Sequence, residues 1–191
     1  MTDGQFTESA LCGTVEQFHI LVDSVEEYAI YMLDPSGNVV TWNRGARKIK
    51  GYTAEEIIGK NFACFYTAED VGADKPQGNL REAARRGHIR DQGLRVRKDG
   101  STFEAEVVLT ALRDANGSIR GYSKVTRDIT DQIRSEHDKT VHELLKVDRD
   151  EFAKNPKKLI KEKERQLNDA VKILDFETAA ILRDEIRVLQ K

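Results

Sequence analysis

Between residues 27 and 128, short runs of hydrophobic residues with strand-like and helix-like patterns follow one another. In Phe103-Glu104-Ala105-Glu106-Val107, apolar and acidic residues alternate, which predicts a strand with one buried and one solvated face. The predicted strands are 29–33, 39–42, 93–97, 102–112 and 119–127, and the predicted short helices are 43–51, 54–58 and 80–86. This order predicts an α+β fold, an antiparallel five-stranded sheet with short helices on one side.

Turn residues separate the predicted strands. Asp34-Pro35-Ser36-Gly37 joins the first two, because proline presets φ and glycine tolerates a positive φ. Lys98-Asp99-Gly100 and Asp114-Ala115-Asn116-Gly117 join the last three, and Asn, Asp and Gly favour hairpin turns at such places. We therefore expect hairpin connections within both groups of strands.

The composition changes after Asp128. Residues 131–191 contain no glycine and are rich in charged helix formers, with equal numbers of basic and acidic residues. Such a tail predicts solvated helices and not a nucleic-acid-binding arm. A connecting helix is expected over 129–147, where Thr140 falls on the sevenfold seam and makes it a poor coiled coil.

A hinge over 148–155 is expected to separate the connecting helix from a second helical element. Asn155 followed by Pro156 is a helix start signal, an N-cap and then proline at the first position. Over 156–191, mostly apolar residues recur at i, i+3, i+4 and i+7 in two stretches, which predicts two antiparallel helices facing each other. The facing positions are Ile160, Lys163, Leu167, Ala170, Val171 and Leu174, then Phe176, Ala179, Leu182, Ile186 and Leu189.

The bulk composition limits the kinds of partner. The 191 residues leave room for one domain and a small appendage. A formal net charge of −2 attracts neither nucleic acid nor an anionic membrane, and no apolar run approaches the ~20 residues that span a bilayer. Cys12 and Cys64 lack the spacing of a zinc site or a disulfide framework. We expect a cytoplasmic protein with no metal site and no direct contact with nucleic acid or membrane.

Five short motifs follow one another in the first part of the chain. They are Leu33 to Gly37, Trp42-Asn43, Gly51 to Lys60, Arg97 to Ser101 and Thr126 to Thr130. Together, in this order and at this spacing, they resemble the PAS sensory domain of the S-box type over residues 14–130. The resemblance implies a domain that senses a small ligand or a partner, and residues 1–13 are expected to be a disordered N-terminus.

The resemblance also bears on the cofactor. Light-sensing LOV members carry a reactive cysteine directly after Gly-x-Asn, where this chain has Phe62, and Cys64 is expected to be a small buried apolar residue. Haem-binding members place a histidine where this chain has residues 76–80, which contain none. A LOV-type flavin adduct and haem are therefore not expected. A non-covalent flavin stays open, with Trp42, Asn43 and Phe62 as ligand-binding candidates, although Asn43 also suits a helix N-cap and Trp42 the core.

A joint between sensor and output is implied where the last strand meets the connecting helix. Arg127 and Asp128 are the charged residues expected to pin this joint, with a plain strand-end role equally open. A change in the sensory core would then shift the last strand and bias the orientation of the helix from Ile129 onward.

The string from Leu174 to Ile186 resembles the UVR motif, a helical hairpin through which the B and C subunits of bacterial nucleotide-excision repair contact each other. The resemblance implies docking onto a protein with a UVR-type or other helical surface, or onto a second copy of this chain. Two short helices bury little apolar area by themselves, and several hydrophobic residues lie outside the facing stripe. These are Leu159, Ile173, Ile181 and Val188. The expected docking residues are Leu167, Ala170, Phe176, Ala179, Ala180, Leu182, Arg183 and Ile186.

Catalytic motifs are not found in the sequence. It contains no G-x-S-x-G, no H-E-x-x-H and no phosphate-binding glycine loop. We expect a non-enzymatic signalling adaptor in which a PAS sensor controls protein docking or dimerisation through a UVR motif. Two alternatives remain, a sensor component of a two-component or excision-repair system that lacks its own catalytic domain, and a purely structural dimer.

Overall fold

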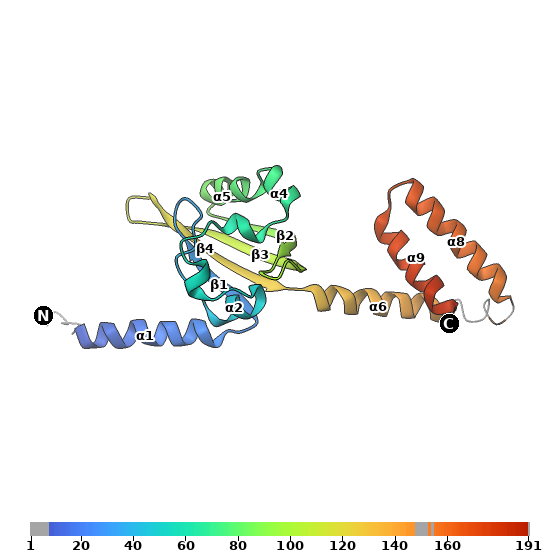
Figure 1. Ribbon diagram of the computed structural model, residues 1–191, viewed down its shortest axis with the longest axis horizontal. Coiled ribbons are helices and arrows are strands. Elements are labelled where there is room, and N and C mark those ends of the chain that lie inside the picture. Colours follow the sequence, from blue (N-terminus) through green and yellow to red (C-terminus); the bar gives the residue numbers. More distant parts are fainter. Residues whose placement is uncertain (1–7, 148–152, 154, 191) are drawn as a thin grey trace, which may run out of the picture. The chain divides into compact units, whose positions relative to one another are not determined.

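The computed structural model describes residues 8–147, 153 and 155–190. The chain divides into a sheet unit, Met1–Thr130, and a helical unit, Asp131–Lys191 (Figure 1). The strands of the sheet unit are β1 (Tyr28–Leu33), β2 (His88–Val96), β3 (Thr102–Arg113) and β4 (Ile119–Asp128). Its helices are α1 (Glu8–Ser24), α2 (Arg44–Lys50), α3 (Ala54–Ile57), α4 (Ala68–Gly72) and α5 (Lys75–Arg86), with a 3₁₀ helix η1 (Phe62–Phe65). Among the described helices, none is long and apolar enough to cross a membrane.

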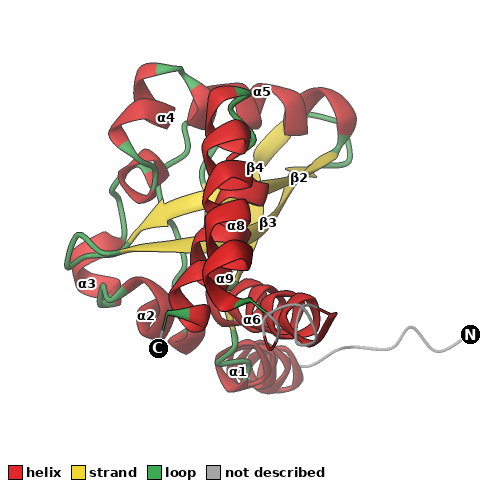
Figure 2. Cartoon of the chain, turned by 90° about the vertical axis from the view of Figure 1, so that its right-hand side faces the viewer, coloured by secondary structure: helices red, strands yellow, loops and turns green. Residues whose placement is uncertain are grey.

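The four strands form one antiparallel sheet in the order β1-β4-β3-β2. Side chains alternate between its two faces, and on β3 the inward positions are Phe103, Ala105, Val107 and Leu109. Figure 2 shows the strands with α2, α3, α4 and α5 around them, and the buried core includes residues of α2, α3 and α5. The core lies between these helices and the sheet, and its largest apolar members include Tyr31, Leu33, Phe62, Phe65, Phe103 and Leu109. The predicted α+β class with helices on one face is confirmed.

The predicted five strands are wrong by one, because 39–42 makes only isolated bridges with its neighbours. At the outer edge of β1, the Met32 carbonyl accepts from the Val40 amide, but the β1 amides donate to side chains and not to a backbone ladder. The amide of Ile30 donates to Asn43 Oδ1 and the amide of Met32 donates to Thr41 Oγ1, both at 2.9 Å. In residues 39–43, side-chain oxygens and not backbone carbonyls accept from the β1 amides, so the segment does not form a regular strand.

Two boundaries also differ from the prediction. Residues 8–13 belong to α1 and not to a disordered N-terminus, because Leu11, Val15 and Phe18 already recur at helical spacing; residues 1–7 lie outside the described part. The strand expected at 93–97 begins earlier, at His88, as β2. Its first residues are polar because this stretch of β2 has a solvated face, so hydrophobicity alone does not mark its start.

Helix α2 lies directly against β1. Asn43 caps it, with Oδ1 accepting from the Ala46 amide at 2.8 Å. Gly45 follows in the first turn, and a Cβ there would lie 2.1 Å from the carbonyl oxygen of Tyr28. Only glycine permits this approach of two backbones. The packing places Lys50, the last residue of α2, over the core.

The helical unit consists of α6 (Thr130–Val147, starting at the last residue of the sheet unit), α8 (Pro156–Lys172) and α9 (Phe176–Leu189). The predicted hinge falls largely on residues 148–152 and 154, outside the described residues. Asn155 caps α8 as predicted, with its side chain accepting from the Lys158 amide. Helices α8 and α9 lie side by side and antiparallel (Figure 1), joined at Ile173–Asp175. The buried apolar residues between them are Ala170, Ala179 and Leu182, with Leu167 packed against them.

Candidate functional site

The core of the sheet unit contains three long basic side chains that are almost completely buried. Arg95 comes from β2, Lys124 from β4 and Lys50 from the end of α2, and their exposed fractions are 0%, 1% and 1%. Lysine and arginine are almost never fully buried unless they are paired. We call these three residues the buried cationic cluster.

Strand alternation places two members of the cluster inside. Lys124 and Thr126 are successive inward positions on β4, and Lys124 is the cross-strand neighbour of Tyr31 on β1. Towards β2, the paired residues Gly93 and Ala105 are small. Long side chains therefore have room to lie across this part of the inner face.

The charge of Arg95 is compensated within the protein. Its Nη2 is 2.5 Å from Asp91 Oδ2 and its Nη1 is 3.8 Å from Asp70 Oδ2. Lys75 Nζ joins the same carboxylates, 3.5 Å from Asp70 and 3.7 Å from Asp91. The guanidinium also lies 4.1 Å from the ring centroid of Tyr66. The two cations, Arg95 and Lys75, and the two carboxylates, Asp70 and Asp91, thus form a group with no net charge.

Lys50 has aromatic rings around its amine instead of a carboxylate. Its Nζ lies 4.3 Å from the ring centroid of Phe65 and 5.3 Å from that of Phe103. Burial and then the nearby charge of Arg95 lower the pKa of Lys50 to about 7. The amine is therefore partly protonated at neutral pH.

Lys124 has a similar environment. Its Nζ lies 4.5 Å from the ring centroid of Phe62, 4.8 Å from that of Tyr66 and 3.4 Å from the Tyr66 hydroxyl. Burial, and after it the charge of Lys50, hold the pKa of Lys124 well below its ordinary value. In the described part of the chain, neither Lys50 nor Lys124 forms an ion pair with a carboxylate.

Polar atoms with few hydrogen-bond partners lie beside the two lysines. Among the described residues, Tyr31 Oη and Thr126 Oγ1 are buried with no hydrogen-bond partner except each other, and Arg95 Nε is buried with none. Buried polar groups normally have partners, so each such atom calls for an explanation. Burial holds the pKa of Tyr31 well above its ordinary value, which keeps its hydroxyl neutral and able to donate.

The three predicted ligand-binding residues differ in their burial and in their distance from the buried cationic cluster. Phe62 is fully buried and forms part of the wall around Lys124. Trp42 is half-buried and stacks on Phe65, with 5.7 Å between ring centroids. Asn43 bonds only within the protein: its oxygen accepts from two amides and its nitrogen donates to three carbonyls. Asn43 therefore fills its capping role and has no free group for a ligand.

The cationic cluster itself was not predicted. The available signal was Lys124, which falls in the alternating inward register of β4 together with Tyr122 and Thr126. The expectation that Cys64 is buried is wrong, since its side chain is exposed. In a 3₁₀ helix residues three apart share a face, so Phe62 and Phe65 point inward and Cys64 between them points outward.

The joint at the end of β4 is held by Asp128 and a partner that the sequence analysis missed. Arg97 Nη2 lies 2.5 Å from Asp128 Oδ2, and Asp128 Oδ1 accepts from the amide of Thr130, the first residue of α6. Burial opposes ionisation of Asp128, but the hydrogen bonds from Arg97 and Thr130 lower its pKa overall. Arg127 is exposed, 5.9 Å from the ring of Tyr28. The structure thus brings Asp128, and not Arg127, into the joint.

Arg97 also connects this joint to the buried cationic cluster. Its Nη1 donates to the carbonyl of Ile49, the residue before Lys50. Its guanidinium lies 4.2 Å from the ring centroid of Phe103, the same ring that contacts Lys50. Two side chains, Arg97 and Asp128, thus connect the backbone next to Lys50 with the start of α6.

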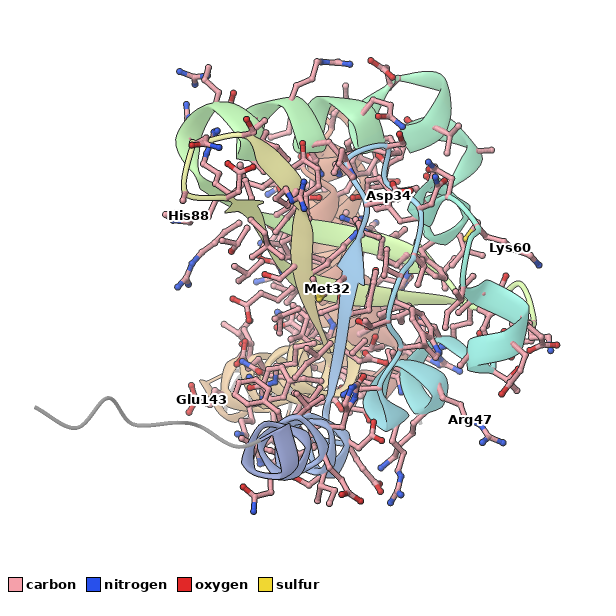
Figure 3. The ribbon with its side chains drawn as sticks, turned by 90° about the vertical axis from the view of Figure 1, so that its left-hand side faces the viewer. Met32, Asp34, Arg47, Lys60, His88 and Glu143 are labelled. Atoms are coloured by element: carbon pink, nitrogen blue, oxygen red, sulfur yellow. The ribbon has the colours of Figure 1, made fainter. Side chains whose placement is uncertain are left out.

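An apolar groove of about 720 Å³ lies in the sheet unit, and the predicted ligand-binding residues Trp42 and Asn43 are among the residues that line it. Figure 3 shows Met32 on β1, with α1 across the lower end of that strand. The apolar residues that line the groove include Val15, Phe18, Val22, Ile30, Met32, Val40 and Ile58. Several of them are strongly exposed, Phe18 at 66%, so this surface suits contact with another protein.

In the helical unit, the helices of the hairpin are fixed to each other by a buried ion pair. Lys163 Nζ of α8 lies 2.9 Å from Glu185 Oε2 of α9, and Glu185 is only 1% exposed. The predicted docking residues that lie buried in this unit are Ala170, Ala179, Leu182 and Ile186. Leu167 and Ala180 are half-buried, and Arg183 is exposed and pairs with Asp184 at 3.0 Å. Much of the predicted docking set therefore holds the hairpin together.

The turn of the hairpin exposes a group of large apolar side chains. Ile173 is 75% exposed, Leu174 70% and Phe176 65%; we call these three residues the apolar turn. Three of the expected facing positions, Val171, Leu174 and Phe176, are exposed. Leu174 and Phe176 lie outside the facing stripe because the chain reverses direction there and Asp175 caps α9. Leu174 has φ +60, in the left-handed region where helices usually end with glycine.

Family models match both parts of the chain. A PAS domain model matches residues 27–131 and the UvrB/UvrC motif matches residues 157–191. The chain therefore belongs to the PAS family and ends in a UVR motif, as its sequence motifs predict. Neither matched model describes a catalytic domain.

One curated protein and two solved PAS domains are similar to this chain. The two-component system protein A of Emericella nidulans is 47% identical over 121 residues, which cover 63% of this chain and 18% of that protein. The chain thus spans under a fifth of the length of this relative. The PAS domain of an HTR-like protein from Haloarcula marismortui superposes with a TM-score of 0.53 at 27% identity, covering 64% of this chain and 97% of that one. A PAS domain from Colwellia psychrerythraea has a TM-score of 0.56 at 24% identity, covering 62% and 98%, and shows the shared fold.

Proposed function

We propose that this protein is a non-enzymatic signalling adaptor in which the PAS unit controls docking of the UVR hairpin onto another protein. The observation that carries the docking half is the apolar turn, where Ile173, Leu174 and Phe176 are largely exposed. Exposed apolar side chains in a contiguous group are typical of interaction sites.

Backbone strain at the turn supports the same assignment. Leu174 takes a left-handed conformation at φ +60, which costs a residue with a Cβ about 1 kcal/mol relative to glycine. A glycine would give the same turn without that strain and without an exposed side chain. Strained, exposed positions of this kind are frequent at binding sites, so docking explains why leucine occupies the place.

The occupant we propose is an apolar helical surface of the UVR type on a different protein. The hairpin core consists of few apolar residues, Leu167, Ala170, Ala179 and Leu182, and a pair of short helices is only marginally stable without further burial. A partner that covers the apolar turn supplies that burial. Dimerisation through the hairpin, or through the groove between α1 and β1, is the competing outcome.

The sensory half rests on the core and the joint. The buried cationic cluster provides an unusual polar interior, and Arg97 connects Ile49 and Phe103 on one side to Asp128 on the other. A change in the core would bias the start of α6 and with it the presentation of the hairpin. The similarity to a two-component system protein favours a second candidate, a sensor component of a two-component system whose catalytic parts reside elsewhere.

Sedimentation and binding measurements test this function. The full chain and a chain ending at residue 147 are compared alone and mixed with hairpins of the UvrB/UvrC type. Binding of the UvrB/UvrC-type hairpin to the full chain, but not to the chain ending at residue 147, supports docking onto another protein. A concentration-dependent dimer that needs residues 148–191 indicates self-docking, and identical behaviour of both chains in both assays contradicts the adaptor function.

A further inference from the structure

We propose that the PAS core binds a small organic carboxylate between the amines of Lys50 and Lys124, with the hydroxyls of Tyr31 and Thr126 as additional donors. This inference rests on the proposed sensory function and names the chemical class of the ligand. Its basis is a core with donors that lack acceptors.

Charge is the first argument. Arg95 and Lys75 share two carboxylates, Asp70 and Asp91, so that group is already neutral. Lys50 and Lys124 are buried to the same degree, and aromatic rings and one hydroxyl lie near their amines. In the described part of the chain, neither lysine forms an ion pair with a carboxylate. An unpaired buried ammonium is strongly disfavoured. A carboxylate between the two amines would supply the missing negative charge.

Hydrogen bonding is the second argument. Tyr31 and Lys124 are cross-strand neighbours, and Thr126 is the next inward residue on β4. The two hydroxyls are buried with no partner except each other, so one of their protons stays free for an oxyanion. Donors from β1, β4 and α2 thus lie around one region of the core, an arrangement typical of a binding site for a specific polar ligand.

The residues that line the region are the third argument. The walls of this region are aromatic, formed by Phe62, Phe65, Tyr66 and Phe103 around the two amines. The sheet beneath is lined by small residues, Ala29 next to Thr126 and Ala105 next to Gly93. The ligand we expect is a monocarboxylate with a short apolar body, because the carboxylate would lie at the amines and the apolar body against the aromatic walls.

Binding should take up a proton. The titratable groups whose charges act on Lys50 and Lys124 are Cys64, Asp91, Arg95, Arg97 and Asp128, and the rings of Tyr31 and Tyr66 lie near their amines. The carboxylates among them, Asp91 and Asp128, are already paired with arginines. A bound anion raises the pKa of the nearby amines, so affinity should fall as the pH rises above about 7, the pKa of Lys50.

The test measures binding of acetate, propionate, butyrate and benzoate to the full chain by calorimetry at pH 6.5 and pH 8.5, with sodium chloride and inorganic phosphate as anion controls. Lys50→Met and Lys124→Met keep the side-chain volume and remove the amine, and buried charges replaced in this way usually leave a protein folded. Lys60→Met is the matched control, since Lys60 is exposed and points away from the core (Figure 3).

The proposal predicts that at least one carboxylate binds at pH 6.5, at least tenfold more weakly at pH 8.5, and at least tenfold more weakly to either cluster variant, with Lys60→Met unchanged. Equal binding of chloride or phosphate, equal binding by the cluster variants, or binding of none of the four carboxylates would overturn it. Hairpin docking is measured on the same samples. Docking retained without carboxylate binding refutes the ligand class alone, whereas loss of docking in every sample refutes the adaptor function.

Discussion

Arg97 and Asp128 form an ion pair, with 2.5 Å between Nη2 and Oδ2, where the last strand ends and α6 begins. The same arginine bonds the carbonyl of Ile49 and stacks on Phe103. One side chain thus contacts the helix that carries Lys50, an aromatic wall of the core and the cap of the output helix. This gives the PAS core a short physical route to α6.

Asp128 offers a test of that route, because its two oxygens have different partners. Asp128→Asn keeps an oxygen for the Thr130 amide and removes the charge that faces Arg97, whereas Asp128→Ala removes both. We expect Asp128→Ala to lower stability by about 1 kcal/mol, as for loss of a helix cap, and Asp128→Asn by less. Both should change hairpin docking several-fold. A collapsed thermal midpoint with docking unchanged per folded molecule would contradict a role at the joint.

The stability of the sheet unit should rise with pH because of Lys50. Its pKa is lowered from 10.5 to about 7 in the folded chain, so between these values the unfolded chain binds more protons. Stability then increases with pH across this window, by a few kcal/mol. Urea unfolding at pH 7 and pH 9.5 measures the rise. Lys50→Met should be more stable than the wild type at pH 7 and show a smaller rise, and an identical rise in both proteins argues against a buried, depressed amine.

The hairpin should depend on the pair Lys163–Glu185. Lys163→Met leaves a charge at Glu185, which is 1% exposed, and loss of one partner of a buried pair costs about 3 kcal/mol. The double variant Lys163→Met/Glu185→Leu removes both charges and should recover most of the loss. Circular dichroism of the helical signal during thermal unfolding compares the three chains. Equal unfolding of the single and double variants would show that the pair does not hold the helices together.

The sheet class could be predicted from alternation, but the number of strands could not. Val39 and Val40 have strand-forming side chains, and the pattern predicts a fifth strand there. Whether that strand forms depends on the edge amides of β1, which bond the side chains of Thr41 and Asn43. Such tertiary hydrogen bonds leave no mark in hydrophobic periodicity.

The candidate sites show the same division. A lysine in a strand is ordinarily expected on the solvated face. Only the inward register that Lys124 shares with Thr126 reveals its burial. Phe176 and Leu174 fit the helical stripe by spacing, yet both face solvent because the chain turns between them. Spacing arguments hold within a helix and fail at its end.

Leu174→Gly separates docking from folding more cleanly than any other substitution in the hairpin. Glycine accepts φ +60 without strain, and relief of that strain is worth about 1 kcal/mol. The free energy of unfolding of the variant should therefore equal or exceed that of the wild type. The same change deletes a side chain that is 70% exposed at the apolar turn. Val188→Ser is the matched control, because Val188 is 51% exposed and lies near the other end of α9.

The most direct measurement is the affinity of the full chain for a UvrB/UvrC-type hairpin, with self-association measured by sedimentation on the same samples. The adaptor account predicts that Leu174→Gly binds at least tenfold more weakly while unfolding at the same or a higher temperature, and that Val188→Ser binds like the wild type. Wild-type affinity in Leu174→Gly, or no association of the wild-type chain with either partner, would contradict it.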